Sequence, residues 1–199
     1  MYRPAAFALD DPAALHAFIR AHPFATIALA RDGAVDLAYA PVVFDGARAR
    51  FHLAAANPVA QAAAGARLKL SFLGAHAYIS PDWYETRTSV PTWNYCAVEG
   101  EGVAERLDDQ ALTALLVDLS AAEEAHLAPK EAWTIDKVPP ERMAMLLKAI
   151  VGFSLRFETL EGKFKLSQNL KRQDFEGAVR GLERRGGGAA AMADLMKNL

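Results

Sequence analysis

Alternating hydrophobic and polar positions predict short β-strands in the first third of the chain. Residues 24–31, 35–44 and 48–54 follow this alternation, and Asp-Gly pairs at 32–33 and 45–46 separate them. Asp-Gly favours a two-residue hairpin loop because both of its positions tolerate a positive φ. We therefore expect these three segments to form an antiparallel meander.

The same two-residue period returns further along the chain. Leu68, Leu70 and Phe72 alternate with Lys69 and Ser71, which predicts a strand with one face in water. The other segments expected to be strands are 76–80 as an extension of this one, 92–106, 151–157, and 164–166 as the hairpin partner of 151–157 across residues 159–162.

Helical periodicity appears between and after these strands. Pro12 follows two aspartates, and Leu15, Phe18 and Ile19 then give an apolar stripe at helical spacing. The other helices expected are a short one capped by Asn57 and ended by Gly65, one capped by Asp108 or Asp109, one from Pro140 to about Lys148, and one from about Lys171, broken at 186–188 and followed by a last helix.

Strands in sequence with inserted helices predict a mainly β, α+β fold. A doubly wound sheet would require strands and helices to alternate throughout, and the first three strands do not. A closed or partly closed antiparallel barrel accommodates the pattern. We expect one barrel domain over residues 1–170, with residues 171–199 forming a helical C-terminal tail packed on it.

Composition describes an ordinary globular protein. Of 199 residues, 52% are hydrophobic and 23% are charged, with a net charge of −2, which argues against a surface dominated by nucleic-acid phosphate contacts. Cys96 is the single cysteine, so it forms no internal disulfide, and its apolar surroundings predict a buried side chain. No leader pattern or membrane-length apolar run is present, so we expect a cytoplasmic protein with no membrane partner.

Residues 74–95 are the most unusual stretch. They hold two of the three tryptophans and three of the five tyrosines within 22 positions, interspersed with turn-forming polar residues. Taken by themselves, these residues allow two interpretations. The aromatic rings could pin a loop to the barrel surface, or they could bind a flat ligand with polar edges, such as a nucleobase or a flavin.

Four ordered motifs carry a family resemblance. His76-Ala-Tyr-Ile-Ser-Pro-Asp-Trp-Tyr84 and Val90-Pro-Thr-Trp-Asn-Tyr95 resemble the central signature of the PaiB-type FMN-binding negative transcriptional regulators. His52-Leu-Ala-Ala-Ala-Asn-Pro58 resembles the segment after the third strand of that family, and Glu161-Gly-Lys-Phe-Lys-Leu-Ser-Gln-Asn169 its late signature. The opening residues also fit, so the resemblance runs from residue 1 to about 183.

The resemblance implies a specific fold and function. It implies an FMN-binding split barrel, usually a homodimer with flavin at the subunit interface, that acts as a negative transcriptional regulator. A flavin-dependent reductase or oxidase of the same superfamily is the alternative, because the isoalloxazine ring can carry redox chemistry. A third possibility is a barrel that has lost flavin and serves as an interaction module. The chain departs from the usual family residues at Tyr39 and Ala60.

A flavin phosphate requires cationic and hydroxyl partners, and the ring requires a flat wall. Strand alternation places Trp93 and Tyr95 on one side and Asn94 on the other, so the first two are expected to wall the flavin, whereas Trp83 and Tyr84 are expected to pack the loop against the barrel. The complete set of candidate cofactor residues is His52, Asn57, Arg67, Lys69, Trp93, Tyr95, Lys165, Ser167, Gln168 and Asn169.

Other interpretations of these residues stay open. Lys163 and Lys165 share a strand face that could be a solvated edge, and Ser167 to Asn169 could cap a helix near Arg172. His52 is more often a structural group than a catalyst in such surroundings. No catalytic motif or metal-ligand spacing appears, so we name no catalytic or metal residue.

The end of the chain is basic. Residues 163–199 hold eight Lys or Arg against four acids, although the whole chain is acidic. This surplus makes DNA a candidate partner. A solvated helical tail is the better explanation, because no convincing helix-turn-helix pair is apparent.

Overall fold

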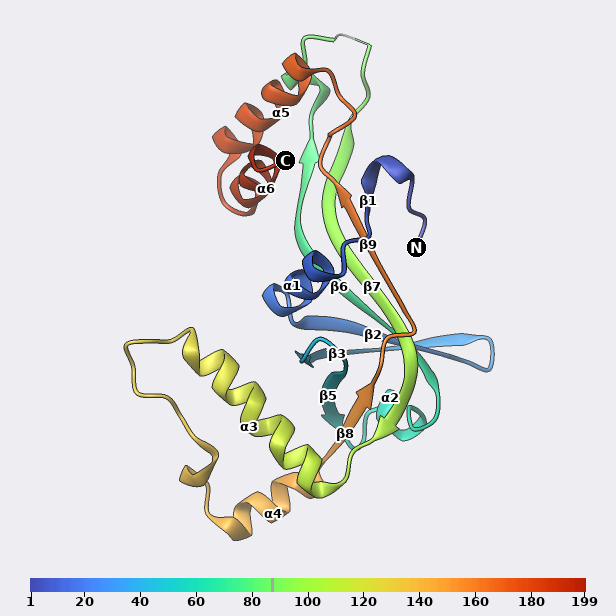
Figure 1. The fold of residues 1–199 in the computed structure, drawn as a ribbon, viewed down its shortest axis with the longest axis vertical. Helices are drawn as coiled ribbons and strands as arrows, with labels where there is room; N and C mark the ends of the chain where they lie inside the picture. The colour runs from blue at the N-terminus through green and yellow to red at the C-terminus, as the bar shows by residue number, and fades with distance from the viewer. Residues whose placement is uncertain (87) are drawn as a thin grey trace. The chain divides into compact units, whose positions relative to one another are not determined.

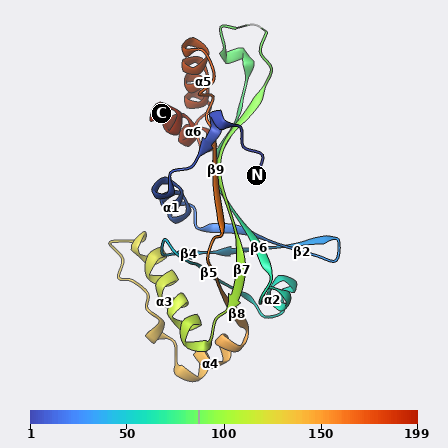
Figure 2. The ribbon, with the colours of Figure 1, turned by 45° about the vertical axis from the view of Figure 1, so that its right-hand side comes forward.

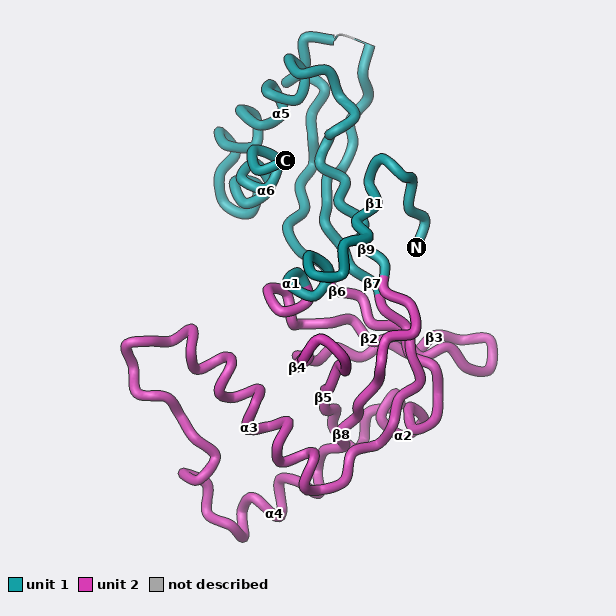
Figure 3. Tube along the Cα trace, in the orientation of Figure 1, with its two compact units in different colours: residues 1–18, 73–99, 161–199 teal, residues 19–72, 100–160 magenta. Residues whose placement is uncertain are grey.

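A computed structural model describes residues 1–86 and 88–199 and divides into two compact units (Figure 3). Unit 1 comprises residues 1–18, 73–99 and 161–199, and unit 2 comprises residues 19–72 and 100–160. Each unit therefore combines segments that are far apart in the sequence. The two longest strands, β6 (Arg67–Ile79) and β7 (Thr92–Arg106), contribute residues to both units.

Antiparallel strands build unit 2 (Figure 1). Besides parts of β6 and β7, its strands are β2 (Phe24–Arg31), β3 (Ala34–Pro41), β4 (Val43–Phe44), β5 (Ala49–Ala54) and β8 (Ile150–Leu155). They follow the order β3-β2-β6-β7-β8-β5-β4. The predicted Asp-Gly turn joins β2 to β3, with a φ of 51° at Asp32 and 77° at Gly33, so this hairpin is confirmed.

The predicted three-strand meander is confirmed only at its turns, because β2 pairs with β3 and β4 pairs with β5, but the middle strand is not continuous. The segment expected at 35–44 is two strands, β3 and β4, and they separate at Pro41 and Val42. The Val42 amide donates to the carbonyl of Pro23, which is the next pair in the β2–β3 register and the last contact before β4 turns to another partner. Strand β5 then pairs with β4 and β8 rather than with β3. Pro41 has no N–H to offer a ladder, which favours a break at this position.

Apolar side chains from β5, β6 and β8 form the centre of unit 2. Phe51 and Phe153 face each other in the β5–β8 ladder, with ring centroids 5.6 Å apart. Leu68, Leu70 and Phe72 are fully buried, as their alternation predicts. The helices of this unit are α2 (Pro58–Ala62), α3 (Asp109–Ala125) and α4 (Pro140–Lys148), with a 3₁₀ turn η3 (Ile135–Lys137).

Unit 1 contains the remaining parts of β6 and β7 and most of β9 (Thr159–Lys165). Its other elements are η1 (Ala5–Phe7), β1 (Ala8–Leu9), most of α1 (Pro12–Ala21), η2 (Pro81–Trp83), α5 (Arg172–Arg185) and α6 (Gly188–Lys197). Strand β9 pairs with β1 and β7. The predicted hairpin between 151–157 and 164–166 is therefore wrong, because β8 and β9 both pair with β7 rather than with each other.

The C-terminal helices pack on one face of unit 1. Helices α5 and α6 lie side by side in both views (Figures 1 and 2). Leu182 and Met192 are fully buried in a cluster that also contains Ile79 of β6 and Cys96 of β7. This burial raises the pKa of the Cys96 thiol to about 12. One face of each helix belongs to this core, and the other face is exposed.

Among the helices of residues 1–86 and 88–199, none combines the length and apolar character needed to cross a bilayer.

Candidate functional site

A cavity of about 350 Å³ lies within unit 1. Thr92, the first residue of β7, and Lys165, the last residue of β9, both line it. The other lining residues come from the loop before β7, the turn after β9 and the N-terminal segment: Phe7, Tyr84, Thr88, Ser89, Val90, Ser167, Asn169 and Leu170. Hydroxyl, amide and ammonium groups therefore share this cavity with apolar side chains.

Lys165 provides the positive charge among these lining residues. Its ammonium is half-buried and donates a hydrogen bond to the hydroxyl of Thr92. Thr88 and Ser89 add two more hydroxyl groups, and Asn169 adds an exposed amide. Ammonium and hydroxyl donors that converge on one cavity are suited to a phosphate, which offers several acceptor oxygens. The described residues therefore fit the phosphate end of FMN.

Ser167 is held in place by a buried polar pair. The Asn94 amide donates to the Ser167 hydroxyl over 2.9 Å, and this hydroxyl lies 3.1 Å from the Asn94 amide oxygen. Asn94 is fully buried, on the face of β7 away from the exposed Trp93. Ser167 has a φ of 63°, an uncommon left-handed conformation for a residue other than glycine. Its hydroxyl is engaged with Asn94, so we assign Ser167 to shaping the turn.

Gln168 closes the same turn. Its side-chain oxygen accepts from the Leu166 amide and its side-chain nitrogen donates to the Phe164 carbonyl, each over 2.7 Å. The alternative that residues 167–169 cap the next helix is wrong, because the N-cap of α5 is Lys171 and has no side-chain capping bond.

Trp93, His76 and Tyr78 form an exposed aromatic cluster in unit 1. The Trp93 side chain is 47% exposed and its indole N–H donates to Nδ1 of His76 over 3.3 Å. The Trp93 and His76 rings stack with centroids 6.0 Å apart, and the Tyr78 ring meets Trp93 edge-on at 6.1 Å. The cluster offers a flat, partly exposed surface of the kind that binds a planar ring.

Tyr95 points to the same side of β7 but has a charged neighbour. The Lys163 ammonium lies 5.2 Å from the Tyr95 ring centroid and 5.3 Å from that of Tyr2, a cation–π arrangement. Lys163 also donates to the Tyr2 carbonyl over 3.0 Å and is only 8% exposed. The solvated-edge interpretation is therefore wrong for Lys163.

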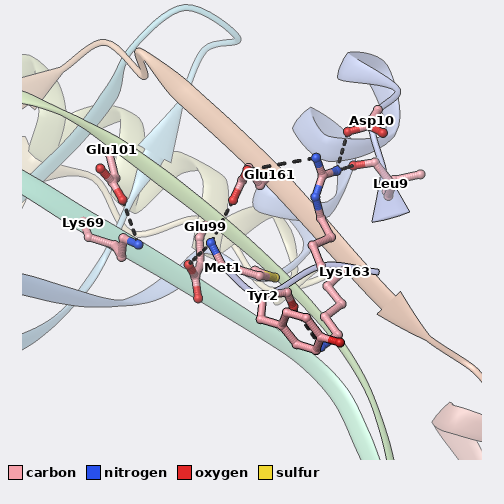
Figure 4. Close-up of polar contacts among 10 residues, drawn as sticks. Met1, Tyr2, Leu9, Asp10, Lys69, Glu99, Glu101, Glu161 and Lys163 are labelled. Atoms are coloured by element: carbon pink, nitrogen blue, oxygen red, sulfur yellow. Dashed lines mark hydrogen bonds and ion pairs between the residues drawn. The ribbon is translucent and has the colours of Figure 1, made fainter. Parts of the chain in front are cut away.

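Ion pairs fix the N-terminal segment beside these rings (Figure 4). The Met1 ammonium lies 2.9 Å from the Glu161 carboxylate and 3.7 Å from that of Glu99. Arg3 pairs with Asp10 and, over 4.0 Å, with Glu161. These contacts tie the chain terminus to β9 and β7.

Four predicted site residues belong to unit 2 and do not line the cavity of unit 1. Arg67 pairs with Glu158 over 2.6 Å, and Lys69 with Glu101 over 2.7 Å. Asn57 caps α2 by accepting from the Val59 amide over 2.9 Å. His52 is half-buried on β5, and burial lowers the pKa of its imidazole. The other six candidates lie in unit 1, where Lys165, Ser167 and Asn169 share the cavity.

Several site residues escaped prediction from the sequence. Tyr84, Thr88, Ser89 and Thr92 line the cavity but were not candidates, although they lie inside the aromatic stretch. The sequence signal that could have identified them is the group of hydroxyl residues, Thr88, Ser89 and Thr92, just before and at the start of β7. No group of three or more metal-ligating side chains occurs in the part of the chain that the structure describes.

The fold defines a class of protein: the antiparallel split barrel typical of flavin-binding proteins. The flavocytochrome Anf3 from Azotobacter vinelandii has this fold, with a TM-score of 0.60 and 18% identity over 79% of this chain and 69% of that chain. An FAD and heme binding protein from Mycobacterium smegmatis gives a TM-score of 0.55 and 19% identity over 78% and 71% of the two chains. At these identities the likeness establishes the fold.

The family is established by sequence. Residues 1–159 match the model of the family described as "Putative FMN-binding domain", and the chain belongs to this family. It is 30% identical to the Protease synthase and sporulation protein PAI 2 of Bacillus subtilis (strain 168) over 204 residues, covering 100% of this chain and 97% of that protein. The predicted family, the split-barrel fold and a flavin cofactor are thereby confirmed.

Proposed function

We propose that this protein is an FMN-dependent negative regulator of transcription of the PaiB type. The observation that carries this proposal is similarity to PAI 2 over nearly the whole of both chains. Such coverage includes the basic C-terminal segment, which lies beyond the residues matched by the family model. The outer face of α5 carries exposed arginines, among them Arg180, Arg184 and Arg185, which supports an approach to DNA phosphates.

FMN would be held by residues of unit 1. Lys165, Thr92 and Asn169 are the groups we assign to its phosphate, because they converge on one cavity. Trp93 and its stacked partner His76 offer a flat surface to an isoalloxazine ring. When bound, FMN supplies a redox-active ring. In a regulator, the described residues would bind this ring and report its occupancy or redox state.

We also propose a homodimer. Val35, Leu37 and Tyr39 alternate along β3 and are 62%, 52% and 60% exposed, so they form an apolar stripe on one face of a strand at the end of the sheet order. A stripe of this kind favours association, and a second copy of the chain is the occupant we expect. We place the protein in the cytoplasm, where a lone buried thiol such as Cys96 stays reduced.

The experiment that tests the regulator compares DNA binding with redox activity. Purified protein carrying flavin is titrated with the DNA upstream of its own gene and with a scrambled fragment, at several salt concentrations. Selective, salt-sensitive binding that changes when flavin is removed supports the proposal. Absence of selective binding, together with steady NAD(P)H consumption by the same preparation, would overturn it in favour of a flavin-dependent oxidoreductase.

A further inference from the structure

We propose that helix α5 positions the flavin site. Asp174, Gly177 and Gly181 of this helix hold the loop that begins at Trp83 and supplies lining residues of the cavity. This inference rests on the proposed binding of the FMN phosphate in that cavity. The α5 residues involved, Asp174, Gly177 and Gly181, follow the end of the family match at residue 159, whereas the loop lies inside it. The positioning role therefore belongs to a segment outside the matched domain.

Asp174 accepts three hydrogen bonds from the loop. Its Oδ1 accepts from the backbone amides of Glu85 and Thr86, over 2.8 and 3.1 Å, and its Oδ2 accepts from the Thr86 hydroxyl over 2.6 Å. The Asp174 side chain is only 4% exposed. A buried carboxylate is retained in a protein when such donors compensate for the loss of water. These bonds, led by that from the Thr86 hydroxyl, keep the pKa of Asp174 below its ordinary value.

Two glycines one turn apart on α5 allow close approach of the same loop. A Cβ atom placed on Gly177 would lie 2.0 Å from the Trp83 carbonyl oxygen, and one on Gly181 would lie 2.1 Å from the Trp83 indole. Neither distance is compatible with a side chain, so both positions require glycine for the loop to sit where it does. The backbone and ring of Trp83 thus rest directly on the helix.

The loop held in this way leads into the cavity wall. Tyr84, between the Trp83 contact and the Asp174 bonds, is itself a lining residue and is 5% exposed. Thr88, Ser89 and Val90 continue the wall a few residues later. Asn169 and Leu170, just before α5 begins, also line the cavity. Helix α5 therefore follows one group of lining residues in the chain and contacts the loop that supplies another.

This arrangement predicts that α5 preorganises the phosphate donors. A loop that is already ordered loses less conformational freedom when a ligand binds, so affinity is higher than for a loose loop. Removing the Asp174 carboxylate frees three loop donors at once. The hydroxyls of Thr88 and Ser89 would then adopt the binding arrangement less often, and the effect would fall on the phosphate rather than on the ring.

The test compares FMN and riboflavin binding to full-length variants by fluorescence titration. We expect Asp174→Ala to weaken FMN binding by about tenfold or more and to change riboflavin binding much less. Asp174→Asn retains one acceptor oxygen and should give an intermediate loss. Glu176→Ala is the matched control, because Glu176 lies on the same helix and pairs with Arg172 and Arg180 rather than with the loop. It should bind FMN like the unmodified protein.

Hydrogen exchange distinguishes a failure of the positioning role of α5 from a failure of the proposed phosphate site. The amides of Glu85 and Thr86 should be protected in the unmodified protein and should exchange faster in Asp174→Ala, at a temperature where circular dichroism shows both proteins folded. Faster exchange with unchanged FMN affinity would overturn the positioning role and leave the proposed site intact. Failure of the unmodified protein to prefer FMN over riboflavin would overturn the phosphate site itself and this inference with it. An equal loss of FMN and riboflavin affinity would indicate general destabilisation and overturn the positioning role.

Discussion

At the scale of single residues, Lys165 provides the sharpest test of the phosphate site. Lys165→Ala removes a charge-assisted contact that contributes about 1.5–3 kcal/mol, so FMN should bind roughly ten- to over a hundred-fold more weakly. Riboflavin, which lacks the phosphate, should bind as before. Lys171→Ala is the control, because Lys171 is an exposed lysine six positions away that does not line the cavity. Equal FMN affinity in both variants, measured by fluorescence titration, would place the phosphate elsewhere.

His52 should make the stability of the protein depend on pH. No described residue offers a hydrogen bond to its buried Nδ1, and burial lowers the pKa of the imidazole in the folded state. The unfolded chain, with a histidine pKa of about 6.5, therefore takes up a proton first as the pH falls. The free energy of unfolding should be highest above pH ~6.5 and should decrease as the pH falls below it.

Substitution tests this assignment. His52→Leu should flatten the decrease between about pH 6.5 and pH 5, measured by urea denaturation across that range. Burial also lowers the pKa of His22, so part of the slope should remain. His126→Gln, at an exposed position after α3, should leave the slope unchanged. An unaltered slope in His52→Leu would assign the pH dependence to other groups.

At the scale of elements, the two tryptophans of the aromatic stretch should give opposite phenotypes. Trp83→Ala empties the space above Gly181 and should lower the melting temperature. The loss should stay below the about 3–5 kcal/mol typical of a fully buried tryptophan, since Trp83 is only partly buried. Trp93→Ala removes a half-exposed ring and should retain most of the stability while losing flavin. Thermal melts and flavin occupancy of both variants distinguish the two roles. Full flavin occupancy in Trp93→Ala would show that the aromatic cluster around Trp93 does not bind flavin.

Elements were predicted better from the sequence than their partners were. Strands β2 and β7 have the predicted bounds, and Asp108 caps α3 as expected, because alternation and capping are local properties. Pairing is not local: β8 and β9 adjoin in sequence yet both pair with β7. Local patterns state which face of a strand is apolar, but which strand lies beside it depends on the whole sheet.

The site was predicted in part for the same reason. Lys165 was expected at a phosphate site for its charge and Asn169 for its place after the strand, and both line one cavity. Other lining residues come from a loop about 80 positions earlier, and Asp174 binds to that loop at Glu85 and Thr86. Isolated residues such as Asp174 carry no sequence signal, since an acid in the first turn of a helix is ordinarily a surface residue stabilised by the helix dipole.

At the scale of the whole molecule, the apolar stripe on β3 predicts the assembly state. Leu37→Asp places a charge at the centre of the stripe without touching the buried face of the strand, so the monomer should remain folded while the dimer dissociates. Sedimentation velocity at micromolar concentration measures the change. Gln110→Asp, an exposed substitution at the start of α3, should leave the assembly as it is. A Leu37→Asp protein that sediments as the unmodified one would exclude this stripe as the interface.

The contact between Trp83 and the glycines of α5 also constrains how this protein can change over evolutionary time. A side chain at position 181 and an indole at position 83 cannot occupy the same volume. The two sites should therefore vary together: relatives with a larger residue at the position of Gly181 should carry a smaller one at the position of Trp83. Such paired replacement would let this loop-to-helix contact be traced through relatives from sequence alone, where α5 extends beyond the family match.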